Sequence, residues 1–264
     1  MKQKKYKERG WKRLLSLVLS LVMVFTLLPV GSVTTYAAGN TVNASSGSGT
    51  ADNPYIISSS ADLKSILSQD TTGKYYKLSD DFNNTEEITE TLSGFYGNLD
   101  GNGKTVKLNI SKPNNVHVGL FFQNSGIISN FTVKGCVLGY EDVGGICGEN
   151  KGGTITNCIN KASVTGNSLV GGISGENSYD TSSKKEGTIR NCQNDGEIIA
   201  SDSYAGGITG KNGDYCSNAS VEDCKNNGNV TCTPYKDYIG YADSKMAYKE
   251  YDGKYCVIGK VGSA

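Results

Sequence analysis

Four segments of this 264-residue chain can be aligned almost residue for residue. They begin at Val118 (VGLFFQN), Val143 (VGGICGEN), Val170 (VGGISGEN) and Ala205 (AGGITGKN). A unit of this size cannot bury its own apolar face, so the copies must stack on one another. The leading glycines are 25, 27 and 35 residues apart, and short apolar alternations divided by Gly and Asn lie between them. This spacing is too short for a propeller blade and predicts an all-β solenoid, each copy forming one coil of a parallel β-helix.

A second set of repeated positions predicts which side chains face the interior. The alignment places like residues in four columns: Phe131, Cys158, Cys192 and Cys224; Val137, Val164, Ile198 and Val230; the small residues Gly135, Ala162, Gly196 and Gly228; and Asn130, Asn157, Asn191 and Asp223. Parallel, in-register stacking at about 4.8 Å produces such columns. We therefore expect an apolar ladder inside the solenoid and an amide ladder at one of its turns.

The N-terminus reads as a secretory signal peptide over residues 1–37. A basic head precedes the apolar run Leu14 to Val30, and small residues lead to a cleavage site after Ala37. An uncleaved N-terminal anchor is the alternative, although the run is short for a membrane span and contains Pro29. Removal of residues 1–37 takes away seven of 26 basic and one of 26 acidic residues, which leaves a net charge of about −6. This charge argues against binding to nucleic acid or to an anionic membrane.

After a flexible Gly/Ser/Asn-rich leader (38–51), residues 52–117 are expected to form an N-terminal cap and the first coils. Ser60 is a candidate helix N-cap, Asp62 suits the first turn, and Leu63, Ile66 and Leu67 share one face. This short helix would cover the open end of the solenoid, where an exposed sheet edge invites pairing. Further on, Asp100-Gly-Asn-Gly103 lacks the spacing and closing glutamate of an EF-hand loop and reads as a turn.

The G-G-I-x-G core, with the x-I-x-N-C that follows it, resembles the GLUG repeat of bacterial secreted and surface proteins. The similarity covers about residues 52–232, with the repeats proper at 118–234. The resemblance implies a right-handed parallel β-helix in a protein of the bacterial cell surface. GLUG repeats also occur beside the catalytic part of IgA-protease-type metallopeptidases. This chain has no HExxH motif, and its single histidine, His117, cannot supply a zinc site alone.

Eight cysteines in an exported chain suggest disulfides, but their positions favour a different interpretation. Three of them share the interior column with Phe131, and Cys147 stands where other copies have Ser174 and Thr209. We expect most of them to be buried thiols, with Cys216 and Cys232 the best candidates for a bridge. No CxxC occurs, so structural zinc is not expected. A cysteine-protease site would need a histidine partner, and His117 reads as a strand residue.

Glu149 and Glu176 occupy the same position in successive copies, and Lys211 takes that position in the next. If the coils stack directly, the two carboxylates lie about one strand spacing apart, which approaches the separation in retaining glycosidases. Such a pair could also bind Ca²⁺. The alternative is that both are solvated turn residues, since the sequence shows neither a cleft nor a second functional group. No catalytic, cofactor or metal residue is therefore assigned.

The pattern breaks in two places, and specificity is expected there. Ser178 to Lys185 is a polar insertion that should form a loop bulging from one coil. The C-terminal region 235–264 is rich in tyrosine, which suits either a cap over the last coil or a surface that grips a glycan or a protein. The tyrosines are Tyr235, Tyr238, Tyr241, Tyr248, Tyr251 and Tyr255.

Together these features indicate an exported, non-catalytic β-helical protein, secreted or held at the cell surface, that binds an extracellular glycan or surface protein. No nucleic-acid partner, cofactor or membrane span after signal cleavage is expected. A polysaccharide-degrading enzyme is the alternative, by analogy with other parallel β-helices alone. A structural stalk, or a fragment of a longer surface protein, is a further possibility.

Overall fold

The computed structural model describes residues 46–66, 69–213, 218–232, 247–251 and 254–258. The signal peptide predicted over residues 1–37 lies outside this part, as do Tyr235, Tyr238 and Tyr241 of the tyrosine-rich region. Of that region the structure describes two strands, β22 (Ala247–Tyr251) and β23 (Lys254–Ile258), which pair antiparallel.

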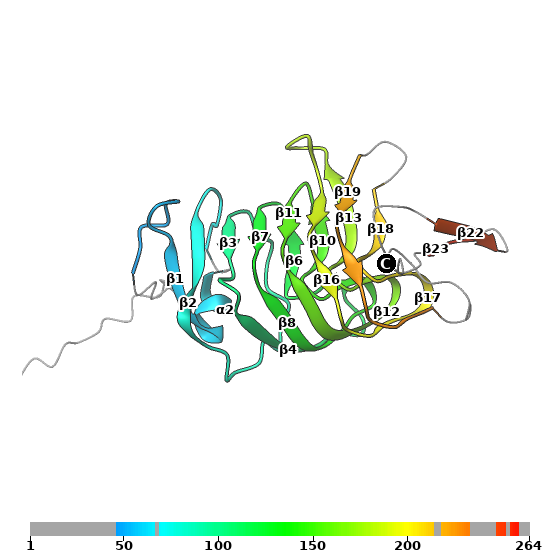
Figure 1. Ribbon diagram of the computed structural model, residues 1–264, viewed down its shortest axis with the longest axis horizontal. Helices are drawn as coiled ribbons and strands as arrows, with labels where there is room; N and C mark the ends of the chain where they lie inside the picture. Colours follow the sequence, from blue (N-terminus) through cyan, green and yellow to red (C-terminus); the bar gives the residue numbers. More distant parts are fainter. Residues whose placement is uncertain (1–45, 67–68, 214–217, 233–246, 252–253, 259–264) are drawn as a thin grey trace, which may run out of the picture. The chain divides into compact units, whose positions relative to one another are not determined.

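The described chain is nearly all β, with one helix and three sheets built mainly from parallel strands (Figure 1). The first sheet contains β1 (Tyr55–Ser59), β2 (Tyr75–Asn83), β3 (Asn98–Asp100), β7 (Ile127–Ser129), β11 (Thr154–Thr156), β15 (Thr188–Arg190) and β19 (Ser220–Glu222). The second contains β6 (Phe121–Asn124), β10 (Cys147–Lys151), β13 (Ser174–Asp180), β14 (Lys185–Glu186) and β18 (Thr209–Asn212). The third contains β4 (Thr105–Ser111), β5 (Val116–Val118), β8 (Thr132–Leu138), β9 (Glu141–Gly144), β12 (Ile159–Gly171), β16 (Gln193–Asn194), β17 (Ile198–Gly206), β20 (Lys225–Asn226) and β21 (Val230–Cys232). Each repeat passes through all three sheets, so the predicted all-β class and the stacking of repeats are confirmed.

The strand register reproduces the columns expected from the sequence. Val164 pairs with Val137 on one side and with Ile198 on the other, and Ile198 pairs with Val230. The column also extends one turn further towards the N-terminus, to Ile110. The small-residue column is required by close backbone approach, since a Cβ added at Gly196 would lie 2.0 Å from the carbonyl oxygen of Ala162.

The interior contains the apolar and cysteine columns. Cys158, Cys192 and Cys224 are free, buried thiols, as is Cys147, whereas Cys136 is exposed. Burial raises the pKa of the Cys147 thiol to about 12. A hydrogen bond with Cys158 raises the pKa of Cys192, and one with Cys192 raises that of Cys224. The prediction of buried thiols is thus confirmed for these residues. The possible bridge between Cys216 and Cys232 stays a prediction, because Cys216 lies outside the described residues.

Two buried asparagine ladders run through the stack, and the sequence analysis missed both. In the longer one, each side-chain amide donates to the next at 2.7 Å, through Asn124, Asn150, Asn177 and Asn212. The shorter one joins Asn160, Asn194 and Asn226 with the same spacing.

The amide ladder that was predicted at a turn is present in part, on the outside. Asn157 Nδ2 donates to Asn130 Oδ1 at 3.1 Å in an exposed position. Both residues have positive φ, as do Asn191 and Asp223 in the same column. Asn and Asp tolerate this left-handed conformation better than other side chains, which explains their repetition there.

The helix α2 (Ser60–Ile66) forms close to where it was predicted, but its cap is one residue earlier. Ser59 Oγ accepts from the backbone N–H of Asp62 at 3.1 Å and donates to the Asp62 carboxylate at 2.9 Å. This reciprocal arrangement makes Ser59 the N-cap, whereas Ser60 is buried. Leu63 and Ile66 join the core next to β1, the edge strand of the first sheet.

The last residues of the expected leader are hydrogen-bonded to the strands. Ile56 N–H donates to the carbonyl of Ser46 at 3.2 Å, and Tyr75 N–H donates to that of Gly49 at 3.0 Å.

Candidate functional site

One turn of the stack is shorter than the turn it lies against. Ile88 is bridged to Leu108, and Leu92 is bridged to Phe121, both in parallel. The chain therefore covers in four residue steps, from 88 to 92, the path for which the next turn uses thirteen steps, from 108 to 121. Within the described residues, β5 pairs with β9 on one side and with no strand on the other. The shortage leaves the stack open beside β5.

Phe122 occupies the position that is glycine in every later turn. The pairing of Phe121 with Cys147 and of Gln123 with Glu149 places Phe122 opposite Gly148, and the same register leads to Gly175 and Gly210. A Cβ at Gly148 would lie 2.3 Å from the His117 backbone, and Gly175 and Gly210 meet Asp142 and Leu169 in the same way. The blocking residue comes from the previous turn, which is short before Phe122. A large side chain fits only there.

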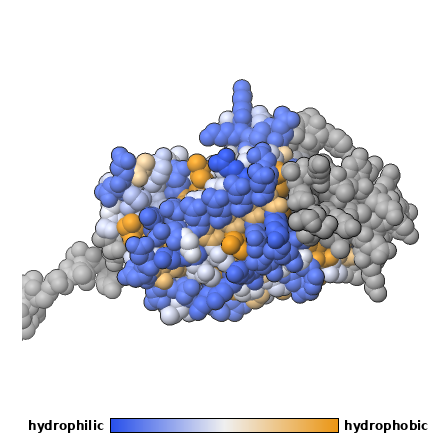
Figure 2. All heavy atoms as spheres, in the orientation of Figure 1, coloured by the Kyte–Doolittle hydropathy of each residue, from blue (hydrophilic) through white to orange (hydrophobic). Residues whose placement is uncertain are grey.

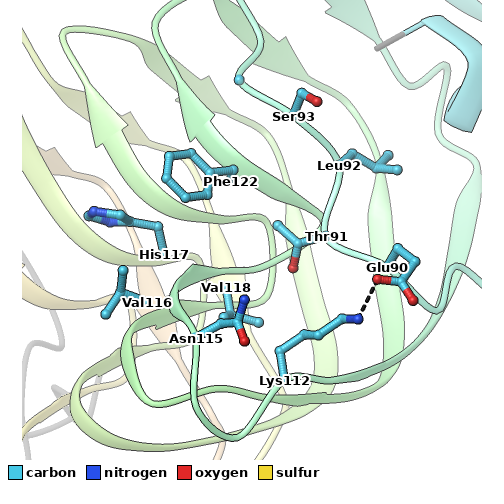
Figure 3. A pocket seen from close by; sticks show the side chains of 11 residues that line it. Glu90, Thr91, Leu92, Ser93, Lys112, Asn115, Val116, His117, Val118 and Phe122 are labelled. Carbon is cyan, nitrogen blue, oxygen red and sulfur yellow. Dashed lines mark ion pairs between the residues drawn. The ribbon is translucent and has the colours of Figure 1, made fainter. Parts of the chain in front are cut away.

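The opening forms a pocket of about 440 Å³ between residues 90–94 and the segment 112–122 (Figure 3). Phe122, a residue that is 41% exposed, lines it with its ring. Glu90 and Lys112 form an ion pair in the pocket lining. Asn115 and Thr91 add an amide and a hydroxyl, and the Thr91 Oγ1 atom is buried and makes no hydrogen bond with any described residue.

His117 connects the pocket to a buried carboxyl group. Its ring packs edge-on against Phe122 at a centroid distance of 4.9 Å, and its Nδ1 lies 3.1 Å from Asp142 Oδ2. The two atoms are close but do not have the geometry of a hydrogen bond, so Nδ1 is left without a hydrogen-bond partner among the described residues. The pKa of Asp142 is raised to about 7, mainly by burial and in addition by the charges of Glu176, Glu141 and Glu149, while Lys211 opposes them.

His117 and Asp142 also belong to a second column of left-handed residues, with Leu169 and Tyr204. Leu and Tyr adopt this conformation at a cost of about 1–2 kcal/mol, unlike the Asn and Asp of the first column. The backbone shape is therefore repeated in the second column, while its side chains differ from turn to turn.

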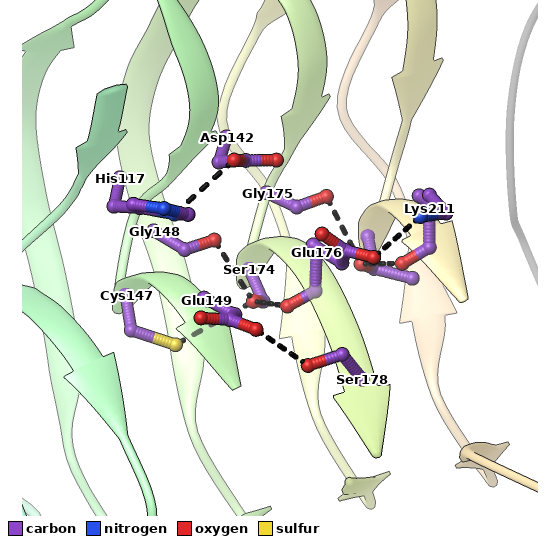
Figure 4. Close-up of polar contacts among 11 residues, drawn as sticks. His117, Asp142, Cys147, Gly148, Glu149, Ser174, Gly175, Glu176, Ser178 and Lys211 are labelled. Carbon is purple, nitrogen blue, oxygen red and sulfur yellow. Dashed lines mark hydrogen bonds and ion pairs between the residues drawn. The ribbon is translucent and has the colours of Figure 1, made fainter. Parts of the chain in front are cut away.

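The carboxylates singled out from the sequence lie on the next turns of the second sheet (Figure 4). In the strand register, Glu149 lies beside Glu176, and Glu176 lies beside Lys211, which confirms the predicted adjacency. Both carboxylates already have partners: Ser178 Oγ donates to Glu149 at 2.7 Å, and Lys211 Nζ donates to Glu176 at 2.6 Å. The pocket of Figure 3 does not include either of them. Across the part of the chain that the structure describes, no group of three or more His, Cys, Asp or Glu side chains is arranged to hold a metal ion.

The other candidate segments have structural explanations. The polar insertion folds as a hairpin, with Tyr179 and Asp180 of β13 paired to β14. Backbone N–H groups of Ser182 and Ser183 donate to the Asp180 carboxylate in its turn. The segment Asp100 to Gly103 is a turn, as predicted, in which Asn102 N–H donates to Asp100 Oδ1 at 2.9 Å.

Sequence reasoning noted His117 but missed the other pocket residues, Glu90, Thr91, Lys112, Asn115 and Phe122. One signal was available, because the first copy of the repeat has a phenylalanine where the aligned copies have glycine. The length difference that opens the pocket could not be found, since residues 88–92 carry no repeat signature.

Comparison with known proteins agrees with the repeat pattern. Residues 201–231 match the family described as the GLUG motif, which confirms the resemblance seen in the sequence. The chain is 34% identical over 119 residues to Halomucin of Haloquadratum walsbyi, and this alignment covers 40% of the chain and 1% of Halomucin. The chain thus matches a very small part of that protein.

A similar fold occurs in a crystal structure from Bacteroides ovatus, of a protein provisionally named an immunoglobulin A1 protease. It has a TM-score of 0.54 and 19% identity, over 75% of this chain and 73% of the other. At this identity the similarity concerns the fold alone. In the described part of the chain, no helix has the length and apolar character needed to cross a membrane.

Proposed function

We propose, from the GLUG repeats that this chain carries, that it is an exported, non-catalytic protein that binds a glycan or a surface protein outside the cell. The matches to the GLUG motif and to Halomucin support placement at the cell surface or in the medium. The signal-like N-terminus supports export.

The scaffold of this protein is, in our proposal, a right-handed parallel β-helix. Parallel pairing of successive repeats in all three sheets supports the helix. Right-handedness follows from the resemblance to GLUG proteins and from the strong preference of parallel crossover connections for that hand.

The pocket beside β5 is the observation that carries the binding function. The repeated interior is filled by apolar columns and by amides that satisfy one another, so it offers nothing to a ligand. The pocket instead combines a partly exposed aromatic ring with unpaired polar groups, as binding sites for small ligands do. The face shown in Figure 2 is largely hydrophilic, with apolar side chains only in small patches, which favours a compact polar ligand over a broad apolar interface.

Two rival functions are distinguishable from this one. For a polysaccharide-degrading enzyme, Asp142 would be the natural proton donor, because its pKa, raised to about 7, leaves a large fraction of it protonated near neutral pH. The carboxylates Glu149 and Glu176 are, however, held by Ser178 and Lys211, which favours a structural role for them. A structural stalk would need no pocket at all.

The experiment is a glycan array and a panel of extracellular proteins probed with the protein as secreted, with reducing-end release measured on each glycan that binds. Binding without release of fragments is expected. Depolymerisation of a bound glycan would replace this proposal with the enzyme, and a complete lack of binding would favour the stalk.

A further inference from the structure

The wall of the pocket that Phe122 forms is suited to the flat face of a sugar. The C–H groups of a pyranose ring make an apolar face, while its hydroxyl groups project around the edge. The aromatic ring of Phe122, a residue that is 41% exposed, is fixed from one side and offers the matching surface. His117 fixes this ring by its edge-on contact at 4.9 Å, and the nearby Asp142 carboxyl lies behind His117.

The charges around the pocket select against an anionic ligand. Inside it, Lys112 and Glu90 neutralise each other. Beyond His117 lie the carboxyl groups of Asp142, Glu141, Glu149 and Glu176. The positive charge that acts against these carboxylates on the pKa of Asp142 is that of Lys211. A uronic acid or a sulfated sugar would therefore approach a predominantly acidic neighbourhood.

The polar groups that are left over suit hydroxyl partners. Asn115 brings an amide that can both donate and accept, and Lys112 brings a donor next to Glu90, an acceptor. The buried Thr91 Oγ1 makes no hydrogen bond with the described residues. A pocket of about 440 Å³ that combines several polar side chains with one aromatic wall falls in the size range of sites that bind a small ligand.

An extended peptide fits this edge less well, although β5 is open on one side. The strand Val116–Val118 has three residues, and His117 at its centre has a φ of +53°. A left-handed residue interrupts the regular row of N–H and C=O groups that an added strand needs.

We propose that the pocket beside β5 binds one uncharged pyranose residue of an extracellular glycan, stacked on Phe122 and hydrogen-bonded by Asn115 and Lys112. This assignment rests on the proposed glycan-binding function and names its site and its ligand class.

The test starts from the neutral glycan that gives the strongest array signal, titrated against the secreted protein and its variants by calorimetry. Phe122→Ala should weaken binding at least tenfold, and Phe122→Tyr, which keeps an aromatic ring, should restore most of it. Tyr75→Ala is the matched control, because Tyr75 is 37% exposed in the first sheet and does not line the pocket. Lys112→Ala, at a half-exposed position, gives a second pocket variant that does not touch the core.

Each outcome decides the question. Loss of binding in Phe122→Ala and Lys112→Ala, with Tyr75→Ala unchanged and all variants fully folded at the temperature of the titration, supports the site. Glycan binding that survives both pocket substitutions overturns the site and leaves the proposed function standing. Binding restricted to anionic glycans, or to an extended peptide that these substitutions abolish, overturns the ligand class. An array without any glycan signal overturns this assignment, and the proposed function falls with it only if the panel of extracellular proteins also shows no binding.

Discussion

Phe122 and Gly175 occupy the same register position in two turns of the stack, and their surroundings differ in one respect. Gly175 lies against the backbone of Asp142 from the turn before, and a Cβ there would be 2.2 Å from the Asp142 carbonyl carbon. The turn before Phe122 is short, so that space is open and is filled by a ring that lines a pocket. A regular repeat therefore uses its groups to hold neighbouring turns together. Only an interruption of the repeat leaves groups for a ligand.

The sharpest way to break this comparison is to put a side chain at the blocked position. Gly175→Ala should cost on the order of 4 kcal/mol, because the clash is with backbone that can move only if the turns separate. Phe122→Ala should cost only about 1 kcal/mol, because the ring is partly exposed. Urea unfolding followed by circular dichroism measures both. Equal costs would mean that the two positions do not differ as described.

The next largest effect is expected in the buried ladder. Asn150→Ala removes an acceptor for Asn124 and a donor for Asn177, each in a hydrogen bond of 2.7 Å, and should destabilise the protein by about 3 kcal/mol. Glu149→Ala, one residue earlier on the outer face, should cost no more than about 0.5 kcal/mol. Comparable urea midpoints for the two variants would contradict the conclusion that the buried asparagine ladder stabilises the fold.

Asp142 tests the same contrast through pH. Its pKa is about 7 when folded and near 3.8 when unfolded, so the folded state holds a proton that the unfolded state has lost between these values. Stability from the neutral carboxyl is complete below about pH 4 and is lost as the pH rises through 7. Asp142→Asn cannot ionise and suits the positive φ, so it should stabilise the protein by about 2 kcal/mol at pH 8.5 and by little at pH 4.

A matched carboxylate should respond in the opposite direction. Hydrogen bonds from Ser183 and Ser182 lower the pKa of Asp180 in the hairpin turn. Its contribution is therefore present at neutral pH and lost on acidification, and Asp180→Asn should slightly destabilise the protein at pH 7. Thermal melts of both variants across pH check the pair. A gain from Asp142→Asn that did not change with pH would rule out ionisation as its cause.

The smallest effect is expected for the outer charged pair. Lys211→Met removes the ion pair with Glu176. Because the Lys211 side chain is 40% exposed, the change in stability should be less than about 0.5 kcal/mol. A salt titration of the melting temperature provides the control, since the contribution of an exposed pair falls as ionic strength rises. A large loss that did not depend on salt would show that Lys211 has a packing role.

Much of the scaffold could be predicted because stacking imposes the same requirement at each turn. The valine column, the small-residue column and the neighbouring Glu149 and Glu176 were all found by aligning the copies. The buried ladders were not predicted, because asparagine is also a common turn residue and its spacing alone does not show whether it faces inward. Asn150 and Asn177 are buried, which shows that they are ladder residues and not exposed turn residues. Their burial depends on the path of all three sheets, which sequence spacing does not give.

The pocket escaped for a different reason. It arises because the connection between Ile88 and Leu92 is shorter than the matching connection in the next turn, and a difference in length leaves no residues to align. The cap of α2 was displaced by one residue because Ser59 and Ser60 are equally good caps by composition, and only the position of Asp62 decides between them.

The central claim is that the repeated positions hold the scaffold together while binding depends on the interrupted turn. The most direct measurement is the affinity for the strongest array glycan in two variants, Phe122→Ala and the double variant Glu149→Ala/Glu176→Ala. The account predicts at least a tenfold loss for Phe122→Ala and an unchanged affinity for the double variant. A loss confined to the double variant would place the ligand on the repeated carboxylates and contradict the account.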